Sequence, residues 1–102
     1  MSRIEKLQEM LKDSPDDSFL QHALALEYIK TGKETEAETL FNRLLSLEPG
    51  YVGSYYHLGK LLERKGEEQA AINVYEKGME QALKANDRHS YNELQMAKEE
   101  LE

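Results

Sequence analysis

The stretch Tyr55–Tyr75, YYHLGKLLERKGEEQAAINVY, decides the fold, because Gln21–Phe41, QHALALEYIKTGKETEAETLF, precedes it as a related copy. The two copies lie 34 residues apart, and they agree in residue size and type along their length. The matched pairs are Leu24 with Leu58, Ala25 with Gly59, Gly32 with Gly66, Ala37 with Ala71, and Phe41 with Tyr75. A fixed period of this length is typical of folds built from stacked helix–turn–helix units.

The composition fits a helical protein whose helices each expose one face. Of the 102 residues, 32% are charged and 39% apolar, and glycine and proline are scarce. The absence of cysteine excludes disulfides, thiolate metal sites and cysteine nucleophiles. A net charge of −7 argues against a nucleic-acid partner, which would require clustered lysine and arginine. With neither a membrane-length apolar run nor a secretion signal, we expect a cytoplasmic protein without a membrane partner.

Helix-breaking residues recur at regular places and predict six helices. Ser14-Pro15-Asp16-Asp17 looks like a helix start, with a capping hydroxyl, proline in the first turn and then acidic residues. Gly32 and Gly66 suit the left-handed residue that follows a last helical turn. Between these breaks the apolar residues keep helical spacing. The predicted helices lie near residues 2–13, 16–30, 34–47, 51–64, 67–85 and 88–100.

The ends of the chain read as half-repeats. Pro15 and Pro49 are also 34 residues apart, so the first helix takes the place of the second helix of a preceding repeat. The last helix echoes the start of repeat two at an offset of 36 residues. We therefore expect one domain, residues 1–102, made of a half-repeat helix 2–13, repeat one 18–51, repeat two 52–85 and a capping helix 88–100.

The set of repeated positions resembles the tetratricopeptide repeat family over nearly the whole chain. Departures from the family pattern are Gln21 for the first aromatic residue, Gly78 for alanine and Leu83 for proline. The resemblance implies an all-α, right-handed helix–turn–helix solenoid of about six antiparallel helices. It also implies a protein–protein interaction module whose first helices line a concave groove for a peptide or partner helix.

Transferring the family's groove face to this chain gives a set of candidate binding residues on three helices. They are Phe19, His22, Leu26, Lys30, Tyr56, Lys60, Arg64 and Asn92, with Ile29, Gly53, Glu63, His89 and Met96 on the same faces. Tyr56 is the aromatic residue that the register places on this face, whereas Tyr28, Tyr55, Tyr75 and Tyr91 occupy core positions. The family's carboxylate-clamping subgroup is a poor match, because His22 and Leu26 stand where its lysine and asparagine would be.

Lys30, Lys60 and Arg64 gather on this face of an otherwise acidic protein, which favours an acidic segment as the ligand. The alternative reading is that Lys30 and Arg64 only offset the dipoles of the helices they end. The three histidines share no metal-ligand spacing, and no cofactor is expected. Adjacent acidic residues on a helix point apart, so we expect no enzyme. The rival function is a self-associating unit (a homodimer through Leu94, Ala97 and Leu101) or a piece of a longer repeat scaffold.

Overall fold

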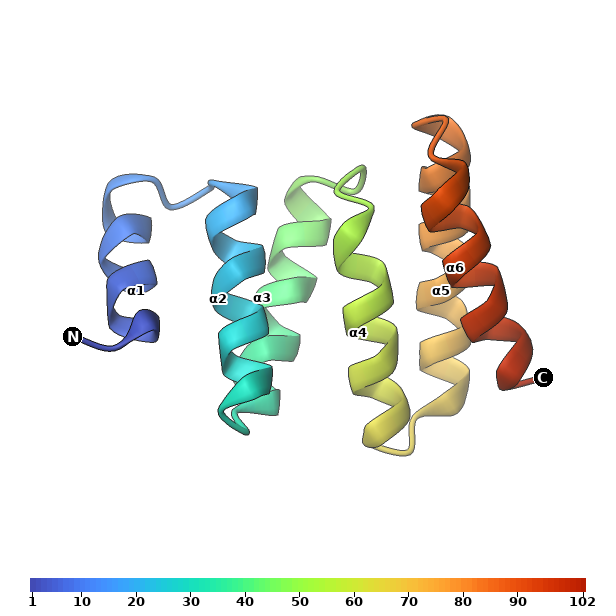
Figure 1. Ribbon diagram of the computed structural model, residues 1–102, viewed down its shortest axis with the longest axis horizontal. Helices are drawn as coiled ribbons and strands as arrows, with labels where there is room; N and C mark the ends of the chain where they lie inside the picture. Colours follow the sequence, from blue (N-terminus) through green and yellow to red (C-terminus); the bar gives the residue numbers. More distant parts are fainter. The chain divides into compact units, whose positions relative to one another are not determined.

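The computed structural model describes residues 1 to 102. The chain forms six α-helices joined by short turns and contains no β-strand (Figure 1). The helices are α1 (Arg3–Asp13), α2 (Ser18–Lys30), α3 (Glu34–Leu47), α4 (Gly53–Arg64), α5 (Glu68–Lys84) and α6 (Arg88–Glu100). They form two compact units, Met1–Glu48 with α1 to α3 and Pro49–Glu102 with α4 to α6. The predicted all-α fold of helical repeats is confirmed, and each helix begins and ends within two residues of its predicted position.

The two repeated glycines end α2 and α4 in the same way. Gly32 and Gly66 both have φ of +80°, a backbone conformation that costs glycine little and other residues more. After Gly32, the backbone N–H of Lys33 donates to the carbonyl of Tyr28 over 2.7 Å, and the equivalent bond after Gly66 measures 2.9 Å. These bonds satisfy carbonyl groups that a helix end otherwise leaves without partners.

The start of α2 corrects the sequence prediction. The capping residue is Asp17, whose carboxylate accepts a hydrogen bond from the backbone N–H of Leu20 over 3.0 Å. Ser14 instead ends α1, and its N–H donates to the carbonyl of Met10. The prediction that Ser14 caps α2 was therefore wrong. A charged acceptor three residues before Leu20 makes a stronger cap than a more distant hydroxyl.

The first unit has its core between α2 and α3, with α1 packed on α2. Leu24, Ala25, Ala37 and Phe41, which all belong to the 34-residue pattern, are buried. From α1, Leu7 is buried, the Nε2 of Gln8 donates to the hydroxyl of Tyr28, and Arg3 pairs with Glu27 over 3.1 Å.

The second unit packs α5 between α4 and α6 around two glycines. A Cβ on Gly59 would lie 2.1 Å from Cε1 of Tyr75, so α4 and α5 approach as closely as glycine allows. A Cβ on Gly78 would lie 2.7 Å from Cβ of Tyr55 and 2.9 Å from Cδ1 of Leu94. Gly78, a departure from the family pattern, therefore admits both α4 and α6 against α5.

The residue at the first aromatic position of the repeat pattern bonds back to the preceding turn. The hydroxyl of Tyr55 donates to the carbonyl of Pro49 over 2.6 Å, and the Nε2 of Gln21 donates to the carbonyl of Pro15 over 2.7 Å. Gln21 thus replaces the aromatic residue while keeping its hydrogen bond. The replacement leaves the Oε1 of Gln21 buried without a partner.

The last two helices differ from the pattern of repeat one. Asn86, with φ of +57°, ends α5 in place of a glycine, and Leu83 keeps the N–H that a proline would lack. On α6, Leu94 and Ala97 are 1% and 4% exposed, so of the apolar stripe expected to remain open for a second copy only Leu101 is partly exposed. Leu94 and Ala97 are therefore not accessible to a second copy of the chain.

Candidate functional site

A cleft of about 380 Å³ lies between α4 and α6 of the second unit. Its lining comprises Tyr56, Lys60, His89, Asn92, Glu93, Met96, Ala97 and Glu100. Three residues of the predicted set, Tyr56, Lys60 and Asn92, are brought together here, and His89 and Met96 of the wider predicted face join them. The volume lies within the range of small-ligand and side-chain pockets in proteins.

The α4 wall of the cleft is a tyrosine followed by a lysine one helical turn later. The spacing of four residues places Tyr56 and Lys60 on the same face, and the Nζ of Lys60 lies 5.6 Å from the centroid of the tyrosine ring. The rings of Tyr56 and His57 also meet in a T-shaped arrangement at a centroid distance of 5.8 Å. The half-buried Tyr56 ring is therefore held by neighbours on its own helix.

Carboxylates surround the ammonium group of Lys60. Its Nζ lies 3.5 Å from an oxygen of Glu63 and 3.9 Å from an oxygen of Glu100. Glu63 in turn accepts a hydrogen bond from the hydroxyl of Tyr75. Burial, and then the Glu63 carboxylate, raise the pKa of Tyr75, so the hydroxyl stays protonated and remains a donor. The charge of Lys60, on which the expected acidic preference partly depends, is largely offset by these neighbours.

The α6 wall carries charges that the sequence prediction did not assign to the site. Glu93 and Glu100 lie on the same face as His89 and Met96, because the steps of four, three and four residues follow helical spacing. That spacing was visible in the sequence once His89 and Met96 had been placed on the inner face. Burial lowers the pKa of His57, with the charge of Glu93 acting in the opposite direction.

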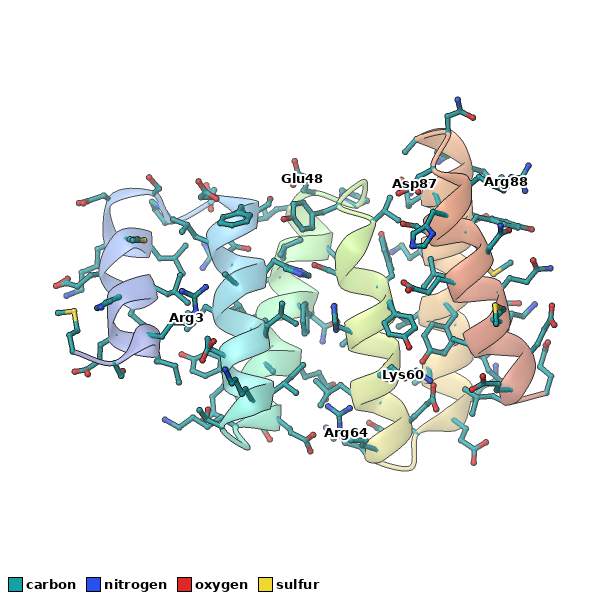
Figure 2. The ribbon with its side chains drawn as sticks, viewed as in Figure 1. Arg3, Glu48, Lys60, Arg64, Asp87 and Arg88 are labelled. Carbon is teal, nitrogen blue, oxygen red and sulfur yellow. The ribbon has the colours of Figure 1, made fainter.

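The remaining predicted residues lie outside this cleft. Arg64 is exposed in the last turn of α4 and is not part of the lining. Figure 2 shows it beyond Lys60 near the end of the helix.

Phe19, His22, Leu26 and Lys30 lie on α2 in the first unit, at spacings that share one helix face. Phe19 is 67% exposed, whereas the ring of His22 packs edge-on against Phe41 at 5.9 Å. Within its own unit, His22 therefore contributes to the packing of α2 on α3.

A second cleft, of about 330 Å³, lies between α2 and α3 and is mainly apolar. It contains none of the predicted residues. No group of three or more histidine, cysteine, aspartate or glutamate residues in the structure could hold a metal ion. None of the six helices is both long and apolar enough to cross a membrane.

Comparison with known proteins extends the resemblance seen in the sequence. Residues 20–51 and 52–87 match the tetratricopeptide repeat family. A chloroplastic tetratricopeptide repeat domain-containing protein of Arabidopsis thaliana, PYG7, is 31% identical over 64 residues, which cover 63% of this chain and 21% of that protein. The chain thus spans about a fifth of the length of that relative.

Two solved structures share the fold over most of the chain. The crystal structure of a tetratricopeptide repeat domain protein from Salinibacter ruber is 41% identical with a TM-score of 0.80, covering 83% of this chain and 94% of that one. A solution structure of a protein from Bordetella parapertussis is 26% identical with a TM-score of 0.84, covering 99% of this chain and 88% of that one.

Repeats of this kind generally serve as protein–protein interaction modules, and the proteins that carry them are generally scaffolds rather than enzymes. The two matched segments cover both copies of the 34-residue pattern and account for most of the chain. The chain therefore belongs to the tetratricopeptide repeat family.

Proposed function

We propose that this protein binds a short extended or helical segment of another protein in the cleft between α4 and α6. The observation that carries the proposal is the convergence of Tyr56, Lys60 and Asn92 on a cleft of about 380 Å³. Sites that take side chains of a partner are concave and combine apolar surface with a few placed polar groups. The role is one of binding rather than catalysis.

The lining supplies both kinds of surface. Tyr56 and Met96, which is 65% exposed, offer apolar area that a partner side chain would cover. Asn92 is exposed on α6, and its amide can donate and accept hydrogen bonds to the backbone of an extended ligand. Apolar contacts would supply most of the affinity, and Asn92 would fix the direction and register of the segment.

The face of α2 that carries Phe19, His22, Leu26 and Lys30 is proposed as a further contact surface of the first unit. An aromatic ring that is 67% exposed, as in Phe19, contributes strongly to binding when a partner covers it. The cytoplasmic location stays a prediction, and so does the acidic ligand that Lys30, Lys60 and Arg64 suggested. The ion pairs of Lys60 weigh against the acidic ligand.

A site of this size is expected to bind with a Kd near 1 μM, or about −8 kcal/mol. The test uses peptides of about twelve residues, selected from a displayed random library for binding to the folded protein. In an extended conformation such a peptide is longer than α6. The selected segments are then titrated into isotopically labelled protein. Amide chemical-shift changes should concentrate on α4 residues 56–60 and α6 residues 89–96.

Asn92→Ala is the informative variant, because the side chain is exposed and its loss should leave the fold intact. The loss of one hydrogen bond of about 1 kcal/mol should weaken binding about fivefold. Asn42→Ala, at an exposed position of α3, is the matched control and should leave the Kd unchanged. Shift changes confined to other helices, or equal affinities for both variants and the wild type, would refute the proposed site.

A further inference from the structure

The cleft between α4 and α6 carries more negative than positive charge. Its lining holds two carboxylates, Glu93 and Glu100, and a single cation, Lys60. We infer that the cleft recognises a segment with basic residues, whose ammonium or guanidinium groups bind Glu93 and share Glu100 with Lys60. This inference rests on the proposed function and names the chemical class of the partner.

The positive charge of Lys60 is already engaged inside the protein. Its Nζ lies 3.5 Å from Glu63 and 3.9 Å from Glu100, and it also lies over the ring of Tyr56. An acidic ligand would have to compete with both carboxylates for this ammonium group, and Glu93 and Glu100 would repel it. The cleft therefore favours a cation over an anion.

Glu93 is the carboxylate of the cleft that lacks an ion-pair partner from lysine or arginine. It is exposed and has no lysine or arginine nitrogen within 4 Å. The nearby imidazole of His57 does not offset its charge at neutral pH, because burial lowers the pKa of His57 and keeps the ring uncharged. A basic side chain at this position would form an ion pair that the protein alone does not provide.

The positions of the two carboxylates predict the spacing of the basic residues. Glu93 and Glu100 are seven residues apart on one helix, which corresponds to two turns or about 10.5 Å. An extended ligand rises about 3.3 Å per residue and turns alternate side chains to one face, so two basic residues four positions apart, about 13 Å along the ligand, would both face α6 and reach the two carboxylates. Met96 lies between the carboxylates and would contact an apolar residue placed between the two cations.

Tyr56 and Lys60 show that a cation fits against this wall of the cleft. An ammonium group sits 5.6 Å from the centre of the tyrosine ring and meets a carboxylate of α6 at the same time. A basic side chain of the partner would meet the same two kinds of surface: an aromatic ring and a carboxylate. Lys60 thus already makes, within the protein, the two contacts that we expect of a partner's cation.

The test uses the displayed random library already described and reads the charge of the selected segments. We expect lysine and arginine to be enriched, at a spacing of about four residues. The best basic segment is then measured by fluorescence anisotropy, at two ionic strengths, against wild-type protein and the Glu93→Gln/Glu100→Gln variant. The variant should bind it about three- to tenfold more weakly, with a smaller dependence on salt.

Because the whole protein is acidic, the control must remove the same charge elsewhere. Glu80→Gln/Glu99→Gln changes two exposed carboxylates that do not line the cleft and should leave the affinity nearly unchanged.

Enriched acidic or uncharged segments that bind at α4 and α6 would overturn the charge preference but not the proposed function. Segments that bind elsewhere, or no binding at all, would overturn both. Equal weakening by the two double variants would reduce the effect to overall charge and would also overturn the inference.

Discussion

Replacement of Gly59 by alanine tests whether the close approach of α4 and α5 is a requirement of this sequence. The added Cβ would lie 2.1, 2.5 and 2.7 Å from three ring atoms of Tyr75, compared with about 3.5–4.0 Å for a comfortable carbon–carbon contact. Tyr75 is fully buried, and its hydroxyl is hydrogen-bonded to Glu63, so the ring cannot move aside without breaking that bond. The substitution therefore forces either the helices or the ring apart.

The size of the effect follows from two opposing contributions. Overpacking of a core costs about 1–3 kcal/mol, and an overlap this large with a fixed ring belongs at or above the upper end. Alanine recovers about 1 kcal/mol because it favours the helix over glycine. We expect a net loss of about 2 kcal/mol in the free energy of unfolding. For a domain of this length, that loss lowers Tm by about 8–16 °C.

The assay is unfolding by urea and by heat, followed by circular dichroism. Gly53→Ala is the control, because it adds the same methyl group at the start of α4 where nothing lies within 4 Å, and it should leave Tm unchanged or slightly raised. Gly59→Ala/Tyr75→Phe should recover part of the loss, since the ring is then released from Glu63. A Gly59→Ala protein as stable as the wild type would refute the reasoning.

Two further predictions concern a buried amide, Gln21, and a partly buried imidazole, His57. Gln21→Met removes the unpartnered buried Oε1 and should raise the free energy of unfolding by about 1 kcal/mol, because Pro15 is an exposed residue whose carbonyl can bind water instead; a loss of stability in urea would contradict this. Burial lowers the pKa of His57 in the folded protein. As the pH drops below about 6.5, the imidazole is therefore protonated in the unfolded chain before it is protonated in the folded protein, and the free energy of unfolding falls. His57→Gln should flatten the dependence of stability on pH between about 7 and 5, and an equally steep urea-unfolding profile in the variant would contradict this.

The sequence predicted the fold well because the decisive features are local or strictly repeated. Gly32 and Gly66 end α2 and α4 in the left-handed conformation, which their recurrence after 34 residues predicts. The start of α2 was harder, because Ser14 and Asp17 are both good caps and only one of them can begin the helix. The charged group nearer the first turn determined the outcome.

The candidate site was predictable only as far as its residues share one helix face. Tyr56 and Lys60 followed from the register of repeat two, and Glu63 is a visible neighbour of Lys60 at three residues' distance. The contribution of Glu100 depends on how α6 is rotated against α4, and the offset of 36 residues had removed α6 from the exact repeat. The charge balance of a cleft between two helices is a tertiary property, so the acidic preference could not be judged from either helix alone.

The two repeats solve the same packing problem differently, and the difference connects the core of the second unit with its cleft. Where repeat one has Ala25 and Phe41, repeat two has Gly59 and Tyr75, and all four residues are buried. The methyl group lost at Gly59 makes room for a ring whose hydroxyl reaches Glu63.

Glu63 is also the nearer ion-pair partner of Lys60, which lines the cleft. The hydroxyl that repeat one lacks thus fixes the carboxylate that holds the lysine in place. From inside the core, Tyr75 therefore influences the position of a charged group in the cleft, and repeat one, with a phenylalanine at this position, has no equivalent connection.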